Sequence, residues 1–251
     1  MTVSMQTPTR FASRSALALL LLCLLGSACS TEGGDQAAEP TASTVAAGGG
    51  TSAAEPGEAT ASFTAEVWAD NWFALSVNGT LMGEDSVPIT TERSFNSETF
   101  EFEASYPLDI AIEAKDFKET DSGLEYIGQP NQQLGDGGVI AQITDNATGE
   151  VVAATDDTWS VLSIHRAPLN AECEASADPD SACTFESAEA PDNWTSPDFD
   201  DSSWPSASIF AEADVRPKDG YGQIAWDASA RLVWATDLEV DNTVLLRGTS
   251  R

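Results

Sequence analysis

The chain contains few basic residues. Eleven Lys and Arg stand against 41 Asp and Glu in 251 residues, so the formal net charge is −30 at pH 7. The acids run through predicted strands and loops alike and do not form a tail. Because so negative a surface repels phosphates, the composition argues against binding of nucleic acid and of anionic lipid headgroups. The excess of acid suits solubility in a salty environment, and some carboxylates could bind divalent cations, which prefer several oxygen ligands.

Histidine is scarcer still, with His165 as the only one. A Ser-His-Asp or Cys-His mechanism would have to use it, but the chain has no Gly-x-Ser-x-Gly turn to supply a serine. A single histidine is also a poor basis for a zinc site. Residues 135–138 (Gly-Asp-Gly-Gly) precede a predicted strand and no lysine follows them, so they predict a tight turn and not a phosphate loop. We interpret His165 as a structural or surface residue.

The chain has no apolar run long enough to span a bilayer. Its longest candidate, residues 16–25, follows two arginines and precedes three small residues, which is typical of a targeting segment over residues 1–28. The pattern resembles a bacterial lipoprotein signal, in which the cysteine after the small residues becomes the lipidated mature N-terminus. That residue is Cys29 here. Ordinary signal cleavage after Ala28 is the alternative.

Cysteines are also few, four in all. Cys23 leaves with the targeting segment. If Cys29 carries lipid, Cys173 and Cys183 remain as a pair, and an oxidising compartment would join them in a disulfide. Metal binding by this pair is disfavoured because no second Cys/His pair lies nearby.

Aromatic residues are absent from residues 29–62, which consist mainly of Gly, Ala, Thr, Ser and Glu. Such a segment cannot bury enough apolar surface to offset its ordering entropy, so we predict a disordered linker. A linker behind a lipid would let a folded domain stand off a membrane. We therefore expect a protein of the bacterial cell envelope, periplasmic or on the cell surface, or else a secreted one. All seven tryptophans lie in residues 63–251, the predicted folded domain.

Residues 70–79 are the clearest strand signal of this domain. Phe73, Leu75 and Val77 alternate with Trp72, Ala74 and Ser76, as in a strand with one buried face, and Asn78-Gly79 suits a two-residue hairpin turn. Further strands are predicted at residues 63–69, 95–103, 108–114, 139–143, 150–154, 159–164, 207–210 and 231–235. Since no stretch predicts a convincing amphipathic helix, the expected fold is all-β, an antiparallel β-sandwich or jelly roll.

Three segments together resemble the galactose-binding-like β-sandwich, the jelly-roll module found as a sugar-binding domain of glycosidases and as a free carbohydrate-binding module. They are residues 70–79, ending in Val-Asn-Gly, residues 155–159 (Thr-Asp-Asp-Thr-Trp) and residues 199–204 (Phe-Asp-Asp-Ser-Ser-Trp). The resemblance implies carbohydrate binding and places Trp204 in the core. Residues 172–185 and 231–247 lie outside the pattern, and we predict the latter to be a final edge strand followed by an acidic tail.

Two groups of residues are candidates for a ligand site. Asp70, Asn71 and Trp72 could hydrogen-bond sugar hydroxyls and stack on a sugar face, or they could form a turn at the edge of the core. Asp200 and Asp201 could bind sugar or calcium, or could simply organise their loop.

A third group, Asp116, Glu119 and Asp121, could bind a structural calcium ion together with nearby Glu125. The spacing is not that of an EF-hand, and a solvated loop is the alternative. Calcium is the one cofactor that the sequence suggests.

The sequence thus predicts a non-catalytic, lipid-anchored carbohydrate-binding module. Its partners would be a carbohydrate, and a membrane only through the lipid. A domain that binds another envelope protein is the alternative. A glycoside hydrolase using paired carboxylates is a third hypothesis, since acids are abundant but the context of a deep cleft is missing.

Overall fold

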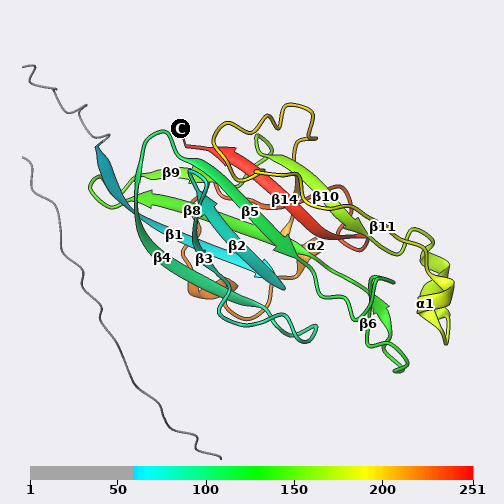
Figure 1. The fold of residues 1–251 in the computed structure, drawn as a ribbon. Helices are drawn as coiled ribbons and strands as arrows, with labels where there is room; N and C mark the ends of the chain where they lie inside the picture. The colour runs from blue at the N-terminus through cyan, green and yellow to red at the C-terminus, as the bar shows by residue number, and fades with distance from the viewer. Residues whose placement is uncertain (1–58, 251) are drawn as a thin grey trace, which may run out of the picture. The chain divides into compact units, whose positions relative to one another are not determined.

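The computed structural model describes residues 59–250. They form two large antiparallel sheets that pack face to face, so the predicted all-β sandwich is confirmed (Figure 1). The targeting segment over residues 1–28 and the lipid site at Cys29 lie outside the described residues, as does the predicted linker up to residue 58. The first strand begins at Thr60, within the last residues of that predicted linker.

One sheet has six strands in the order β12-β13-β8-β1-β4, with β9 paired to β8. Its strands are β1 (Thr60–Asp70), β4 (Asn96–Ser105), β8 (Gly138–Asp145), β9 (Val151–Ala154), β12 (Ser208–Phe210) and β13 (Leu232–Trp234).

The other sheet has the order β11-β10-β14-β5-β2-β3. Its strands are β2 (Trp72–Val77), β3 (Thr80–Glu84), β5 (Asp109–Lys115), β10 (Ser160–Arg166), β11 (Glu186–Ser187) and β14 (Asp241–Thr249). A separate two-stranded sheet pairs β6 (Leu124–Glu125) with β7 (Gln133–Leu134).

Helices are short connectors. They are α1 (Pro179–Ala182), α2 (Glu212–Val215) and the 3₁₀ turns η1 (Ala171–Ala175) and η2 (Tyr221–Gln223). Among the residues described, none of these helices has the length and apolarity needed to cross a membrane.

The hairpin predicted from Asn78-Gly79 is confirmed. Both residues have positive φ, 51° and 77°, and they join β2 to β3. Phe73, Leu75 and Val77 are fully buried between the sheets, while the residues that alternate with them are half-buried. Each of the other predicted strands overlaps a strand of the structure.

Strand β1 is buried on both faces at its C-terminal end. Val67 and Ala69 point into the core between the sheets, whereas Trp68 belongs to a second cluster on the outer face with Ile140 and Val215. The indole Nε1 of Trp68 donates a hydrogen bond to the carbonyl oxygen of Asp219, at 3.0 Å. The segment that contains α2 and η2 therefore covers this sheet and brings residues 212–221 close to the end of β1.

The prediction for the C-terminal segment was wrong in two respects: the strand predicted at residues 231–235 overlaps β13, which lies between β12 and β8 and not at an edge, and the predicted tail forms a strand. Residues 241–249 form β14, which lies between β10 and β5 in the middle of a sheet and is buried over residues 241–247. The loop after β11 lies over the outer face of this strand. There the Arg247 side chain donates a hydrogen bond to the carbonyl oxygen of Trp194. Trp204 is not in the core: it is half-buried against Trp194 and Phe199, with ring centroids 6.5 and 5.5 Å away.

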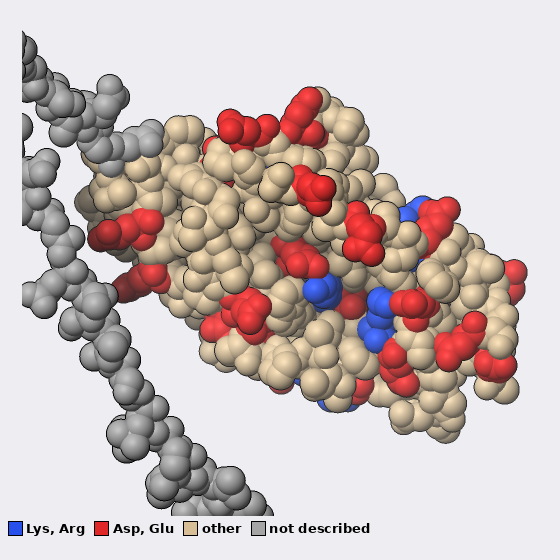
Figure 2. All heavy atoms as spheres, viewed as in Figure 1, with Lys and Arg blue, Asp and Glu red and all other residues tan. Residues whose placement is uncertain are grey.

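The acidic side chains remain on the surface over most of the domain. Figure 2 shows Asp and Glu spread over the visible face, with few Lys and Arg among them. Buried carboxylates are therefore the exception, and three of the six described ones, Asp70, Asp116 and Glu125, gather at one place.

Candidate functional site

Four carboxylates meet at one end of the sandwich because of how the strands pair. Asp70 ends β1, and in the antiparallel register it faces Gly138 at the start of β8, two residues after Asp136. Asp116 directly follows β5, whose last residue pairs with the first residue of β2. Glu125 comes from β6. One carboxylate oxygen from each of Asp116, Glu125 and Asp136 lies within 4.8 Å of the other two.

These carboxylates are buried without enough partners. Asp70 is 0% exposed, and Asp116 and Glu125 are each 2% exposed. Oδ1 of Asp70, both carboxylate oxygens of Asp116 and Oε1 of Glu125 have no hydrogen-bond partner within the described part of the chain. Glu125 Oε2 accepts a hydrogen bond from Gln133 Nε2 at 2.8 Å. Burying an ionised carboxylate without a partner is costly, so this cluster needs a proton or a cation.

Lys218 supplies one positive charge. Its Nζ lies 3.1 Å from Asp136 Oδ2 and 3.3 Å from Asp70 Oδ2, and it also lies over the ring of Phe95. The Lys218 side chain is 37% exposed, so it reaches the cluster from the solvent side. Neither Asp116 nor Glu125 forms an ion pair with it among the described residues.

Burial moves the pKa values of these acids upward. Burial, with the nearby charge of Asp136, raises the pKa of Asp70 to about 7. Burial also raises the pKa of Glu125 to about 7. The pKa of Asp116 is raised well above its usual range, first by burial and then by the charge of Asp70. The cluster thus holds protons near neutral pH when nothing else neutralises it.

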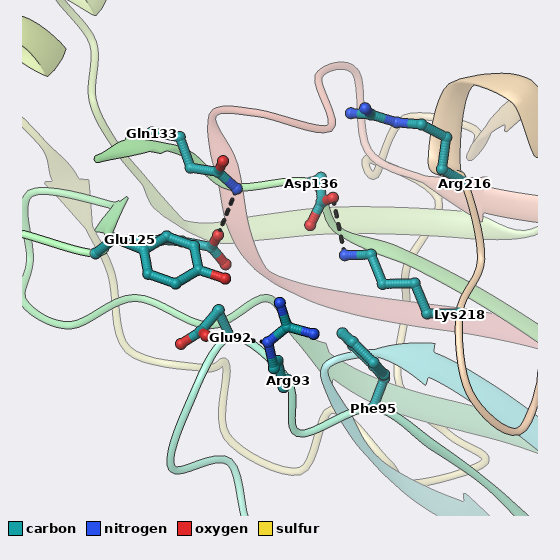
Figure 3. A pocket seen from close by; sticks show the side chains of 9 residues that line it. Glu92, Arg93, Phe95, Glu125, Gln133, Asp136, Arg216 and Lys218 are labelled. Atoms are coloured by element: carbon teal, nitrogen blue, oxygen red, sulfur yellow. Dashed lines mark hydrogen bonds and ion pairs between the residues drawn. The ribbon is translucent and has the colours of Figure 1, made fainter. Parts of the chain in front are cut away.

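A pocket of about 270 Å³ opens beside the cluster, with Glu125 and Asp136 in its wall (Figure 3). Its lining combines acceptors, donors and two aromatic rings: Glu92, Arg93, Phe95, Glu125, Tyr126, Gln133, Asp136, Arg216 and Lys218. The residues come from the loop before β4, from β6 and β7 and the residues just after them, and from the segment after α2.

Of the first predicted ligand group, only Asp70 belongs to this cluster. Asn71 holds the fold together: its Oδ1 accepts from Phe117 N at 2.6 Å, and its Nδ2 donates to Glu92 O at 3.1 Å. Trp72 is half-buried, and Lys115 Nζ lies 4.4 Å from its ring centroid. These contacts match the alternative interpretation of Asn71 and Trp72 as residues that shape the edge of the core.

Asp200 and Asp201 lie at the other end of β2. Residues 195–197 of the same loop lie next to Gly79 of the hairpin turn. Asp200 accepts a hydrogen bond from Ser202 N at 3.1 Å, and Asp201 Oδ2 lies 3.6 Å from Arg247 Nε. The structure therefore does not bring the two predicted ligand groups together.

The predicted calcium group is also divided. Asp116 lies in the buried cluster, but Glu119 and Asp121 are exposed. Glu119 Oε1 accepts from Ile127 N at 2.9 Å, and Asp121 pairs with Lys118 Nζ at 2.6 Å. Glu125, which the sequence placed beside this group, does lie near Asp116, and Asp136 joins these two.

Asp136 was not predicted as a site residue from the sequence, because residues 135–138 were interpreted only as a turn. A signal was present in the glycine before it. A Cβ atom on Gly135 would lie 1.8 Å from Asp116 Oδ2, so the turn can approach that carboxylate only without a side chain.

The predicted disulfide is confirmed, with the sulfur atoms of Cys173 and Cys183 1.97 Å apart. Both cysteines pack against Leu124, the neighbour of Glu125, and so support β6. His165 is buried and its Nδ1 lies 2.9 Å from Asn242 Oδ1, while burial lowers its pKa. These contacts agree with the structural role expected for His165.

No protein-family model, curated protein or solved structure matches this chain.

Proposed function

We propose that this protein is a non-catalytic carbohydrate-binding domain of the bacterial cell envelope, exported by residues 1–28 and anchored through lipid on Cys29. Its ligand site is the pocket lined by Glu92, Arg93, Phe95, Tyr126 and Arg216 beside the buried carboxylates. The mixture of donors, acceptors and rings in this one pocket is the observation that carries the proposal. The motifs that resemble galactose-binding-like modules support the same ligand class.

The chemistry of the lining suits a polyhydroxylated ligand. Each sugar hydroxyl both donates and accepts, so it pairs well with carboxylates on one side and guanidinium groups on the other. Glu92 offers the first kind of group, and Arg93 and Arg216 offer the second. The apolar face of a sugar ring can stack on an aromatic side chain, which Phe95 and Tyr126 provide. The volume of about 270 Å³ limits the enclosed part of the ligand to a small unit at the end of a glycan.

The test is isothermal titration calorimetry of the purified protein against mono- and oligosaccharides chosen from a glycan array. Tyr126→Ala removes a ring from the pocket and should weaken binding about tenfold, the equivalent of ~1.4 kcal/mol. Trp72→Ala is the matched control, because Trp72 is an aromatic residue that does not line the pocket. Binding that survives Tyr126→Ala but is lost in Trp72→Ala would refute the site. The absence of any glycan ligand would leave the alternative of an envelope protein as partner.

Glycoside hydrolysis is a second candidate function, favoured by one observation. Glu125, with a pKa raised to about 7, has a carboxylate oxygen within 4.8 Å of one from Asp136, and a pair of carboxylates performs this reaction. Chromatography of the glycan after incubation distinguishes the two functions. Shortened products that disappear in Glu125→Gln would establish a hydrolase, whereas an unchanged glycan is the result expected of a binding domain.

A further inference from the structure

The buried ends of Asp116, Glu125 and Asp136 are arranged as ligands that lack an ion. The three residues come from three separate segments, yet one carboxylate oxygen of each lies within 4.8 Å of the others. Calcium binds oxygen ligands at about 2.3–2.6 Å, so two ligands of one ion are separated by at most about 5 Å. A single ion between the three carboxylates could therefore reach all of them.

A second observation is independent of this spacing. Asp116 is only 2% exposed, and neither of its carboxylate oxygens has a hydrogen-bond partner in the described structure. Oε1 of Glu125, equally buried, also lacks one. The Asp116 carboxylate is directed at the turn that carries Asp136, because a Cβ atom on Gly135 would lie 1.8 Å from its Oδ2. Buried polar atoms normally have partners, so these oxygens indicate a missing positive group.

Lys218 does not fill this role. Its ammonium pairs with Asp70 and Asp136 and forms no ion pair with Asp116 or Glu125 among the described residues. With all groups ionised, four carboxylates and one ammonium leave three negative charges at this end of the sandwich. A monovalent ion would leave two, whereas a divalent ion leaves one.

We propose that Asp116, Glu125 and Asp136 bind one calcium ion at the floor of the pocket. The ligand atoms are all carboxylate oxygens, which suits a hard cation and disfavours zinc or copper. Calcium fits better than magnesium, because three side chains from separate segments give an irregular site, and magnesium requires near-ideal octahedral geometry at about 2.1 Å. Asp136, whose side chain is 16% exposed, opens the site to the pocket, from which water can complete the coordination.

This ion would lie behind the ligand pocket and join one segment from each of three sheets. Asp116 continues a strand of one large sheet, Asp136 leads into a strand of the other, and Glu125 belongs to the small third sheet. The site is thus a cross-link between three sheets, and it is independent of whether the pocket binds a sugar.

The experiment is calorimetric titration of the purified protein, freed of metal with EDTA and dialysed, with CaCl₂ alone at pH 7.5. We expect one ion per chain with a dissociation constant in the range of about 10⁻⁴–10⁻³ M or tighter, typical of extracellular modules. Asp116→Asn should weaken calcium binding at least tenfold. Asp121→Asn is the matched control, since it removes an exposed acid of the same stretch and should leave binding unchanged.

A second variant guards against a folding defect. Gly135→Ala places a methyl group against the Asp116 carboxylate and should also weaken calcium binding, with circular dichroism reporting whether each variant folds. Equal binding by wild type and folded Asp116→Asn would overturn the proposal, as would no heat with CaCl₂ on the wild-type protein. MgCl₂ that binds as tightly as CaCl₂ would overturn the choice of calcium. No sugar is present, so failure of the carbohydrate proposal leaves this result intact.

Discussion

Replacing Asp70 by asparagine should make the stability of this protein less sensitive to pH. Asp70 is fully buried, and its pKa rises from 3.8 to about 7 in the folded protein. Between these two values the folded state retains a proton that the unfolded state has released. The contribution of this group to the free energy of unfolding is therefore fully present below about pH 4. It falls as the pH rises and is lost above about pH 7.

The expected change in the free energy of unfolding depends on the pH range of the measurement. The isoelectric point is near 4.1, so we choose pH 5 to pH 8, where the protein stays charged. Each pH unit below the folded pKa is worth about 1.4 kcal/mol, so Asp70 should lower the free energy of unfolding by about 3 kcal/mol between pH 5 and pH 8. With a urea m value of about 2 kcal/mol/M, the midpoint moves by about 1.5 M.

The assay is urea unfolding followed by tryptophan fluorescence, in EDTA so that no cation neutralises the cluster. The wild-type protein should lose this stability across the window relative to Asp70→Asn, whose amide resembles the protonated acid at every pH. Asp85→Asn is an internal calibration: Asp85 is 4% exposed and burial raises its pKa to about 6, so its effect should be smaller and complete by about pH 6. A wild-type-minus-variant difference for Asp70 that stays constant from pH 5 to pH 8 would refute the reasoning.

Two further predictions concern the packing around the site and the core. Cys173→Ser should cost about 2–3 kcal/mol, because the disulfide closes a loop across a sequence separation of 10 residues, and reductant should lower the urea midpoint of the wild-type protein but not that of the variant. Equal midpoints in oxidised wild type and variant would contradict this. Gly248→Ala should cost about 1–3 kcal/mol, since its Cβ would lie 2.4 Å from Cε2 of Trp159, whereas Gly222→Ala, with nothing within 4 Å, should be neutral. A neutral Gly248→Ala in the same urea assay would show that the indole can move aside.

The fold was readable from local patterns because strands and turns depend on neighbouring residues. The alternation around Phe73 and Leu75 marks a half-buried strand, and Asn78-Gly79 marks the turn that ends it. The position of a strand within its sheet depends on partners far along the chain. Strand β14 was therefore mistaken for part of an acidic tail, because its alternating sequence does not reveal that β10 and β5 flank it.

The site shows the same division. Asp70 and Asp116 were singled out from the sequence, but each was grouped with its neighbours in the chain. Glu125 was named beside Asp116 as a possible calcium ligand, whereas Asp136 was interpreted only as part of a turn. Antiparallel pairing of β1 with β8, and of β5 with β2, moves these residues to one end of the sandwich.

The sequence by itself determined the composition, the alternation of the strands, the hairpin and the pairing of the two cysteines, because each depends on residue type and short spacing. Only the tertiary structure decided which of the 41 acidic side chains become buried. An acidic side chain has the same chemistry everywhere in the chain, and its proton affinity and its demand for a cation arise when folding buries it beside others.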